Sequence, residues 1–138
     1  MSGRVVLDAH AWIWLAEGNQ TLRRQAQVAI ADSLARGPAM VPAISVREVA
    51  MRARLGHVQF SATIADWVSG ALSDSRVELV PLRPEISVES CNLPGRLRKD
   101  PADRVIVATA RIAGATLITR DDRVLDYARR GYVEAIKA

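Results

Sequence analysis

Residues 100–122 have the sequence DPADRVIVATARIAGATLITRDD, and this stretch alone contains one complete helix, one strand and the start of a second helix. The helix is predicted to begin at Asp100-Pro101, because proline is favoured at the first helical position. Apolar residues then recur at helical spacing until Gly114, which is expected to end the helix. A strand over residues 115–119 and a helix over residues 121–130 follow directly. Such short alternating units are typical of an α/β fold.

The rest of the chain continues this alternation in both directions. Further strands are predicted over residues 5–7, 39–43, 77–82 and 132–136. Further helices are predicted over residues 11–16, 22–36, 45–55, 61–72 and 84–93. Pro42 indicates that its strand lies at an edge of the sheet or ends there. We therefore expect one domain over residues 1–138, a three-layer α/β/α sandwich with a mainly parallel central sheet.

The composition is that of a globular protein of a reducing compartment. Its 138 residues are 49% hydrophobic, enough for one core, and Cys91 is the single cysteine, so no intrachain disulfide can form. No signal peptide or membrane-spanning run is evident, and we expect a cytoplasmic location. The formal net charge of +4 suits an anionic partner such as a nucleic acid, but it equally suits a merely soluble domain.

Four acidic residues are predicted to lie at one edge of the sheet, where the parallel strands end and the next helices begin. Asp8 follows the first strand, Glu48 lies one turn into the helix after the second, and Asp121 follows the strand over residues 115–119. Asp103 lies in the first turn of the helix before that strand. If these side chains converge, their mutual repulsion calls for a cation, and Mg²⁺ prefers such oxygen ligands. The chemistry that this arrangement favours is water attack on a phosphodiester.

Each acid also has a local explanation, because helix starts collect acidic residues. Asp8 can cap a helix. Ser45 is expected to be an N-cap that forms a capping box with Glu48, and Asp103 suits the helix dipole behind the Asp100 N-cap.

Three segments, taken together and in this order, carry a family resemblance. They are VVLDAHAWIWLA (5–16), PAISVREVAMRARLG (42–56) and DPADRVIVATARIAGATLITRDDRVLDYA (100–128). The chain resembles the PIN-domain family, and within it the VapC-type toxins of toxin–antitoxin pairs. The resemblance covers nearly the whole chain.

The resemblance implies a metal-dependent endoribonuclease. In that family four acids hold one or two Mg²⁺ or Mn²⁺ ions, and the matching positions are Asp8, Glu48, Asp103 and Asp121. It also places hydroxyl groups at Thr119 and Ser45 close to the metal. Ala9 departs from the pattern, because a Ser or Thr is usual there. The partners implied are an RNA substrate, a small antitoxin that occupies the active-site groove, and a second copy of the chain.

The mechanism we expect gives the acids different roles. Asp8 and Asp103 are the main direct ligands, Asp121 completes the site, and Glu48 orients or deprotonates the attacking water. Because the nucleophile is water, the products would carry a 5′-phosphate and a 3′-hydroxyl. The expected phosphate contacts, each of which can also be plain solvated surface, are Arg47, Arg104, Arg120 and the basic run 96–99.

Other functions remain as alternatives. The main one is a non-catalytic α/β module that binds RNA or protein. A metal-free ribonuclease would need His10 and His57 as acid and base, although their spacing suggests no shared site. A phosphoacceptor domain needs a suitably placed lysine, and neither Lys99 nor Lys137 fits.

Overall fold

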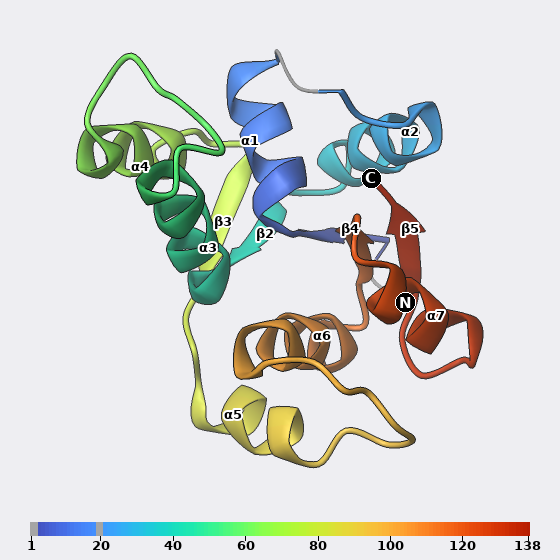
Figure 1. Ribbon diagram of the computed structural model, residues 1–138. Coiled ribbons are helices and arrows are strands. Elements are labelled where there is room, and N and C mark those ends of the chain that lie inside the picture. The colour runs from blue at the N-terminus through green and yellow to red at the C-terminus, as the bar shows by residue number, and fades with distance from the viewer. Residues whose placement is uncertain (1–2, 19–20) are drawn as a thin grey trace.

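Five short strands form the centre of the molecule and seven helices surround them, in a computed structural model that describes residues 3–18 and 21–138 (Figure 1). The strands are β1 (Val5–Leu7), β2 (Ala39–Pro42), β3 (Val77–Val80), β4 (Thr116–Thr119) and β5 (Ala135–Lys137). The helices are α1 (Ala9–Glu17), α2 (Arg24–Leu34), α3 (Ala43–Arg54), α4 (Ile64–Leu72), α5 (Pro84–Cys91), α6 (Pro101–Ala113) and α7 (Asp122–Arg129).

All five strands are parallel and lie in the order β3-β2-β1-β4-β5. The predicted three-layer α/β/α sandwich is confirmed. The sheet is wholly parallel, and helices join each strand to the next one along the chain, as parallel strands require. Pro42 does end its strand, as one of the two expectations had it. The other expectation was wrong: β2 is an inner strand, and Pro42, its last residue, pairs with Val80.

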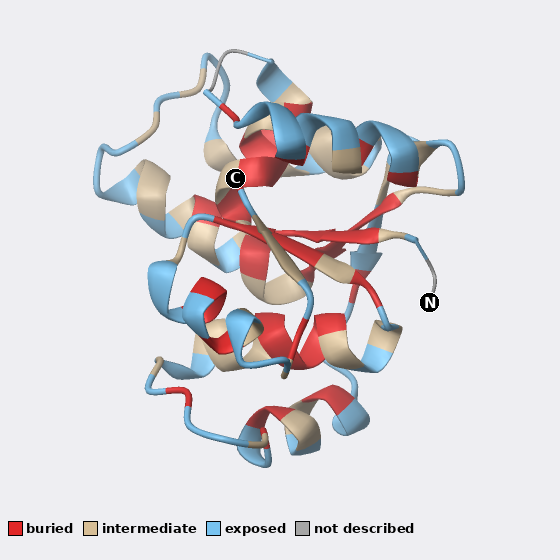
Figure 2. Cartoon of the chain, turned by 90° about the vertical axis from the view of Figure 1, so that its right-hand side faces the viewer, coloured by how far each residue is buried: buried red, intermediate tan, exposed pale blue. Residues whose placement is uncertain are grey.

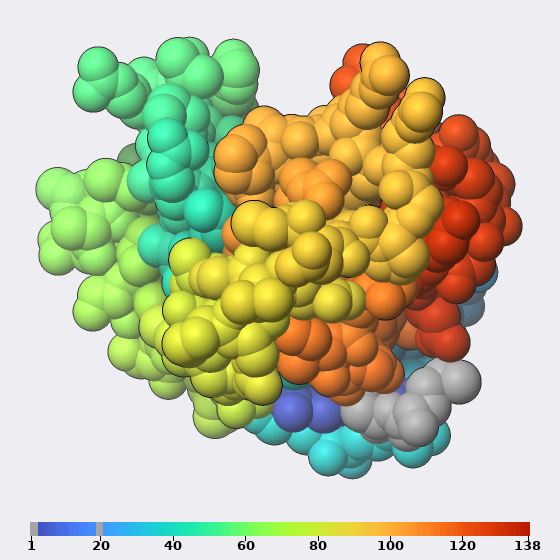
Figure 3. Space-filling view, turned by 90° about the horizontal axis from the view of Figure 1, so that it is seen from below, coloured from blue at the N-terminus to red at the C-terminus, as the bar shows by residue number. Residues whose placement is uncertain are grey.

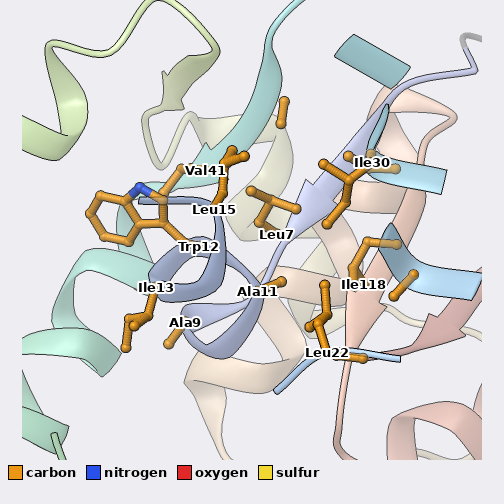
Figure 4. Close-up of a cluster of buried hydrophobic side chains, with 14 of the residues drawn as sticks. Leu7, Ala9, Ala11, Trp12, Ile13, Leu15, Leu22, Ile30, Val41 and Ile118 are labelled. Carbon is orange, nitrogen blue, oxygen red and sulfur yellow. The ribbon is translucent and has the colours of Figure 1, made fainter. Parts of the chain in front are cut away.

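The sheet separates two hydrophobic layers. Along β1 the side chains of Val5 and Leu7 join the core beneath α1 and α2, whereas Val6 joins the core over α6 and α7. Successive residues of a strand point to opposite faces, so this short strand can be buried on both sides. Figure 2 shows the resulting buried band between the helical layers, and Figure 4 shows Leu7 and Trp12 within the first core. Fully burying one such side chain contributes about 1.5–3 kcal/mol.

Helix α6 has the boundaries that its sequence predicts. The carboxylate of Asp100 accepts a hydrogen bond from the backbone N–H of Asp103 at 3.1 Å, and Pro101 is the first helical residue. Gly114 ends the helix with φ 62°, a left-handed conformation that residues with a side chain rarely adopt. The chain reverses at Gly114 and continues as β4, which pairs with β1.

Several predicted boundaries were wrong. Helix α1 begins at Ala9 rather than at residue 11, α4 begins at Ile64 rather than at residue 61, and β3 ends at Val80 rather than at residue 82. Helix α3 begins at Ala43, directly after Pro42, and so Ser45 lies inside the helix rather than at its N-cap. The last strand covers only Ala135–Lys137, because the chain bends at Tyr132, whose ring lies tilted against that of Tyr127 with centroids 4.8 Å apart.

None of the helices in residues 3–18 and 21–138 has the length and apolar character needed to cross a membrane.

Candidate active site

The site lies where the strand order of the sheet reverses. From β1 the chain crosses to β2 and β3 on one side, whereas β4 and β5 lie on the other. The two sets of crossover helices cover opposite faces and leave a crevice at the carboxyl ends of β1 and β4, which is the usual ligand site of open parallel sheets. Asp8 directly follows β1, and Thr119 ends β4.

All four predicted acids line one cavity of about 260 Å³ at this crevice, namely Asp8, Glu48, Asp103 and Asp121. Thr119 lines it too. The walls come from α3 on one side and from α6 on the other, and these helices flank a notch in the view from below (Figure 3). Residues from position 8 to position 121 thus meet in one small volume.

Asp8 is held by backbone donors from two segments. Its Oδ1 accepts a hydrogen bond from the N–H of Ala11 at 2.9 Å, and its Oδ2 accepts one from the N–H of Arg120 at 3.2 Å. Burial raises the pKa of Asp8, although these hydrogen bonds and one from the Thr119 hydroxyl oppose that rise. Asp8 is therefore a helix cap, as its local explanation predicts, and it also lines the cavity.

Asp121 and Asp103 form the opposite wall. Asp121 caps α7 by accepting from the N–H groups of Arg123 at 2.9 Å and Val124 at 3.1 Å. Burial, with the neighbouring Asp100, raises the pKa of Asp103 to about 7. For Asp121 the effect of burial is outweighed by hydrogen bonds from Lys99 and the backbone, and its pKa is lowered.

Asp100 and Asp122 adjoin these two acids in sequence but do not line the cavity. Asp100 is the exposed cap of α6, and Asp122 points toward Lys137, whose Nζ lies 3.4 Å from its Oδ1.

Lys99 occupies an unexpected position. Its Nζ lies 2.6 Å from Oδ2 of Asp121 and 3.5 Å from Oδ2 of Asp103, so one ammonium bridges two of the four acids. The hydrogen bond with Asp121 raises the pKa of Lys99. The predicted phosphate contact of Lys99 stays a prediction; in the structure its charge is paired with these two acids.

Ser45 and Glu48 do not form a capping box. The Ser45 hydroxyl is fully buried and donates to the backbone carbonyl of Leu7 at 3.1 Å. Ser45 lies outside the cavity lining, but it holds the residue that precedes Asp8. Glu48 lies in the second turn of α3 and lines the cavity.

The predicted arginine contacts divide into two groups. Arg104 donates to the carbonyls of Ser90 at 2.8 Å and Leu97 at 2.7 Å and is a structural residue, while Arg47 is exposed outside the cavity. Arg120 lines the cavity, although its guanidinium donates to the carbonyl of Thr21.

Sequence reasoning missed Arg52, which also lines the cavity. It follows Glu48 by four residues on α3, so helical spacing could have indicated that the two share a face. His10 lines the cavity as well, and burial, with Arg120 and Arg52, lowers its pKa to about 4. His57 is exposed and lies outside the lining, so the two histidines do not form a catalytic pair.

The donor set suits a hard divalent cation. Carboxylate and hydroxyl oxygens surround the cavity, and Mg²⁺ characteristically takes one or two carboxylates directly and keeps several waters. Among the described residues, no three His, Cys, Asp or Glu side chains form a ready-made metal cage. The arrangement therefore fits an ion held through few direct ligands.

Comparisons with known proteins agree with this geometry. The family model of the PIN domain matches residues 5–130. The chain is 34% identical over 122 residues to Ribonuclease VapC22 of Mycobacterium tuberculosis (strain ATCC 25618 / H37Rv), which covers 87% of this chain and 88% of that protein.

Two solved structures share the fold at low sequence identity. VapBC2 from Rickettsia felis, bound to a DNA fragment from their promoter, aligns with a TM-score of 0.67 at 12% identity and covers 97% of this chain and 98% of that chain. A toxin–antitoxin complex from Klebsiella pneumoniae aligns with a TM-score of 0.63 at 23% identity, over 96% of this chain and 95% of that chain.

Proposed function

Because this chain belongs to the PIN-domain family, we propose that it is a divalent-metal-dependent endoribonuclease that acts as the toxin of a toxin–antitoxin pair. The observation that carries the proposal is the shared cavity of Asp8, Glu48, Asp103 and Asp121. The similarity to a curated ribonuclease over 87% of the chain supports the reaction class.

Asp8, Asp103 and Asp121 would hold the Mg²⁺ or Mn²⁺ ion. When bound, the ion supplies a more acidic water and neutralises charge on the phosphodiester. Asp8 is suited to direct coordination because two backbone donors fix its carboxylate, and the lone pairs that they do not use can face the cavity.

Glu48 would orient the attacking water and accept its proton. It lines the cavity from α3, across from the wall that carries Asp103. A carboxylate within hydrogen-bond reach of the water is the geometry that a general base requires. Since water and not the ribose 2′-hydroxyl attacks, cleavage would leave a 5′-phosphate and a 3′-hydroxyl.

Arg52 would contact the RNA phosphate. Two other cations near the acids are already engaged, because Lys99 is paired with carboxylates and Arg120 donates to a carbonyl. Arg52 lines the cavity, and its positive charge helps to lower the pKa of His10 and opposes the rise of the pKa of Asp8. A guanidinium matches two phosphate oxygens at once, so Arg52 would orient the phosphate beside the acids.

The proposed protein partner is a small antitoxin that covers this cavity, and a second copy of the chain is the proposed dimer partner. The support is the likeness in fold to chains of toxin–antitoxin complexes.

The decisive experiment is RNA-end mapping with the full chain, its Asp8→Asn variant and an Asp126→Asn control. Asp126 is an exposed acid whose Oδ1 accepts from Arg129 at 3.1 Å, so its loss tests removal of a carboxylate as such. We expect 5′-phosphate ends with wild type and Asp126→Asn in Mg²⁺, and none with Asp8→Asn or in excess EDTA. Undiminished cleavage in EDTA would contradict the proposal. RNA binding without cleavage by wild type would favour the non-catalytic binding module instead.

A further inference from the structure

We propose that Lys99 is the resident counter-ion of the acid site, and that a divalent cation must displace its ammonium from Asp103 and Asp121 in order to bind. This inference rests on the proposed metal site and adds a residue that tunes its affinity. Lys99 is not one of the acids that would coordinate the ion, and its role is to compete for them.

The geometry is that of a bridging cation. The Nζ of Lys99 lies 2.6 Å from Oδ2 of Asp121, a short charge-assisted contact, and 3.5 Å from Oδ2 of Asp103. The two carboxylates come from different elements: Asp103 from the first turn of α6 and Asp121 from the cap of α7. One positive charge therefore balances two acids that converge only through the fold.

The bridge is partly shielded from water. Only 18% of the Lys99 side chain is exposed, against 27% for Asp103 and 26% for Asp121. Solvent and salt screen such a pair less than an exposed one. An incoming metal ion therefore has to compete with the Lys99 ammonium for the carboxylates of Asp103 and Asp121.

The identity of the residue supports displacement. Of the 19 basic residues, only Lys99 and Lys137 are lysine, and the others are arginine. An arginine here could form two parallel hydrogen bonds to a carboxylate. Lysine is instead a compact point charge on a flexible four-carbon stem, and it can swing away while its backbone stays in place.

A divalent ion and the ammonium cannot both remain. An ion coordinated by the same Oδ2 atoms would lie within a few ångströms of Nζ, where like charges repel strongly. The site would exchange one positive charge for two. Breaking the Lys99 contacts opposes ion binding, so the observed affinity for the ion is lower than it would be without Lys99.

The test measures Mn²⁺ binding by calorimetry with the full chain stripped in EDTA and dialysed, at about pH 8.5 to keep the carboxylates ionised. The variants are Lys99→Met, which keeps an unbranched side chain without the charge, and Lys99→Arg, which keeps the charge on a planar guanidinium. Lys137→Met is the matched control, because Lys137 is the other lysine and lies 3.4 Å from Asp122, outside the cavity.

We expect Lys99→Met to bind Mn²⁺ about three- to tenfold more tightly than wild type, which corresponds to the worth of a partly shielded ion pair. Lys99→Arg should bind more weakly than wild type, and Lys137→Met should be unchanged. The two Lys99 substitutions thus shift the affinity in opposite directions. If the Lys99 ion pairs only held the loop before α6 in place, Lys99→Met would instead bind Mn²⁺ more weakly than wild type.

The melting temperature gives a second readout that needs no catalysis. Lys99→Met should be less stable than wild type in EDTA, because Asp103 and Asp121 then repel each other, and saturating Mn²⁺ should remove that difference. Equal or weaker Mn²⁺ affinity of Lys99→Met, with wild type binding normally, would overturn the role of Lys99 alone. Absence of Mn²⁺ binding in every variant would overturn the metal site and this inference together.

Discussion

Oδ2 of Asp8 accepts a hydrogen bond from the backbone N–H of Arg120 at 3.2 Å, and these two residues lie 112 positions apart in the chain. The bond joins the end of β1 to the segment that leaves β4. It also fixes the orientation of the carboxylate that is central to the proposed site. One side chain therefore serves folding and chemistry, and substitutions can separate the two roles.

Asp8→Asn and Asp8→Ala should lose the same activity but differ in stability. Asparagine still offers an oxygen to the N–H of Ala11, whereas alanine leaves the helix without a cap, so we expect Asp8→Ala to be less stable than Asp8→Asn by about 1–2 kcal/mol. Each should cleave RNA more than about 100-fold more slowly than wild type. Urea unfolding and a cleavage assay on the same preparations measure these effects. Equal stability of the two variants would deny Asp8 its capping role.

Asp121→Asn and Asp122→Asn form a matched pair of neighbouring acids. Asp121 lines the cavity, whereas Asp122 faces Lys137 outside it. Asparagine can still cap α7, so Asp121→Asn should fold normally and lose activity more than about 100-fold. Asp122→Asn should stay within about twofold of wild type. If initial cleavage rates rank the two variants the other way, the wrong acid of the pair has been placed in the site.

Ser45→Ala should destabilise the protein by about 1–2 kcal/mol, because it removes a buried hydrogen bond to the carbonyl of Leu7. Ser73→Ala is the control: its hydroxyl also donates to a carbonyl, that of Ser69, but it is exposed, and its loss should cost less than about 0.5 kcal/mol. Denaturant midpoints of the two variants give the comparison. Similar values for both would mean that the Ser45 bond has no special weight.

The stability of the metal-free protein should depend on pH through Asp103. Burial raises the pKa of Asp103 from 3.8 to about 7, so the folded chain holds this proton more tightly than the unfolded chain. The stabilisation is fully present below the unfolded value and is lost as the pH rises through about 7. In Asp103→Asn this contribution is absent.

The measurement is urea unfolding of wild type and Asp103→Asn in EDTA, at several pH values from about 4 to 8. The pKa of His10 is lowered to about 4, which gives a slope of the opposite sign. Because His10 is present in both proteins, the difference between them isolates Asp103. Wild type should lose stability relative to the variant as the pH rises, and parallel curves would rule this out.

Arg52→Met should raise the KM for RNA by about tenfold with a smaller change in kcat, since a charge-assisted phosphate contact is lost. Arg47→Met is the control on the same helix, because Arg47 is exposed and outside the cavity, and its KM should change by less than about twofold. Steady-state cleavage of a short RNA at two salt concentrations distinguishes the variants. If both variants show the same KM for RNA, Arg52 does not contact the substrate phosphate in the proposed way.

Local signals predicted the parts of the fold that local physics determines. The start of α6 at Asp100-Pro101 and its end at Gly114 depend on residues within one turn of each boundary. The convergence of the four acids was also predictable, because strand ends of a parallel sheet share one edge. That inference needed the order of elements but no knowledge of individual contacts.

Contacts between distant segments were the part that sequence reasoning missed. The pattern around Ser45 resembles an N-cap, yet its hydroxyl bonds to Leu7, which lies 38 positions away on another element. Lys99 was grouped with its basic neighbours, and nothing near it in the sequence reveals that it reaches Asp121. Such partners are set by tertiary packing, which propensity and periodicity do not encode.

The ammonium held between Asp103 and Asp121 also bears on the order of events during synthesis. Many small metalloproteins stay unfolded until their ion arrives, because the free energy of metal binding is part of their free energy of folding. Because Lys99 supplies the positive charge, the starts of α6 and α7 can pack together in a nascent chain as soon as α7 has left the ribosome. Folding would then be independent of the magnesium supply, and metallation would come afterwards, as a separate event that switches on an already finished protein.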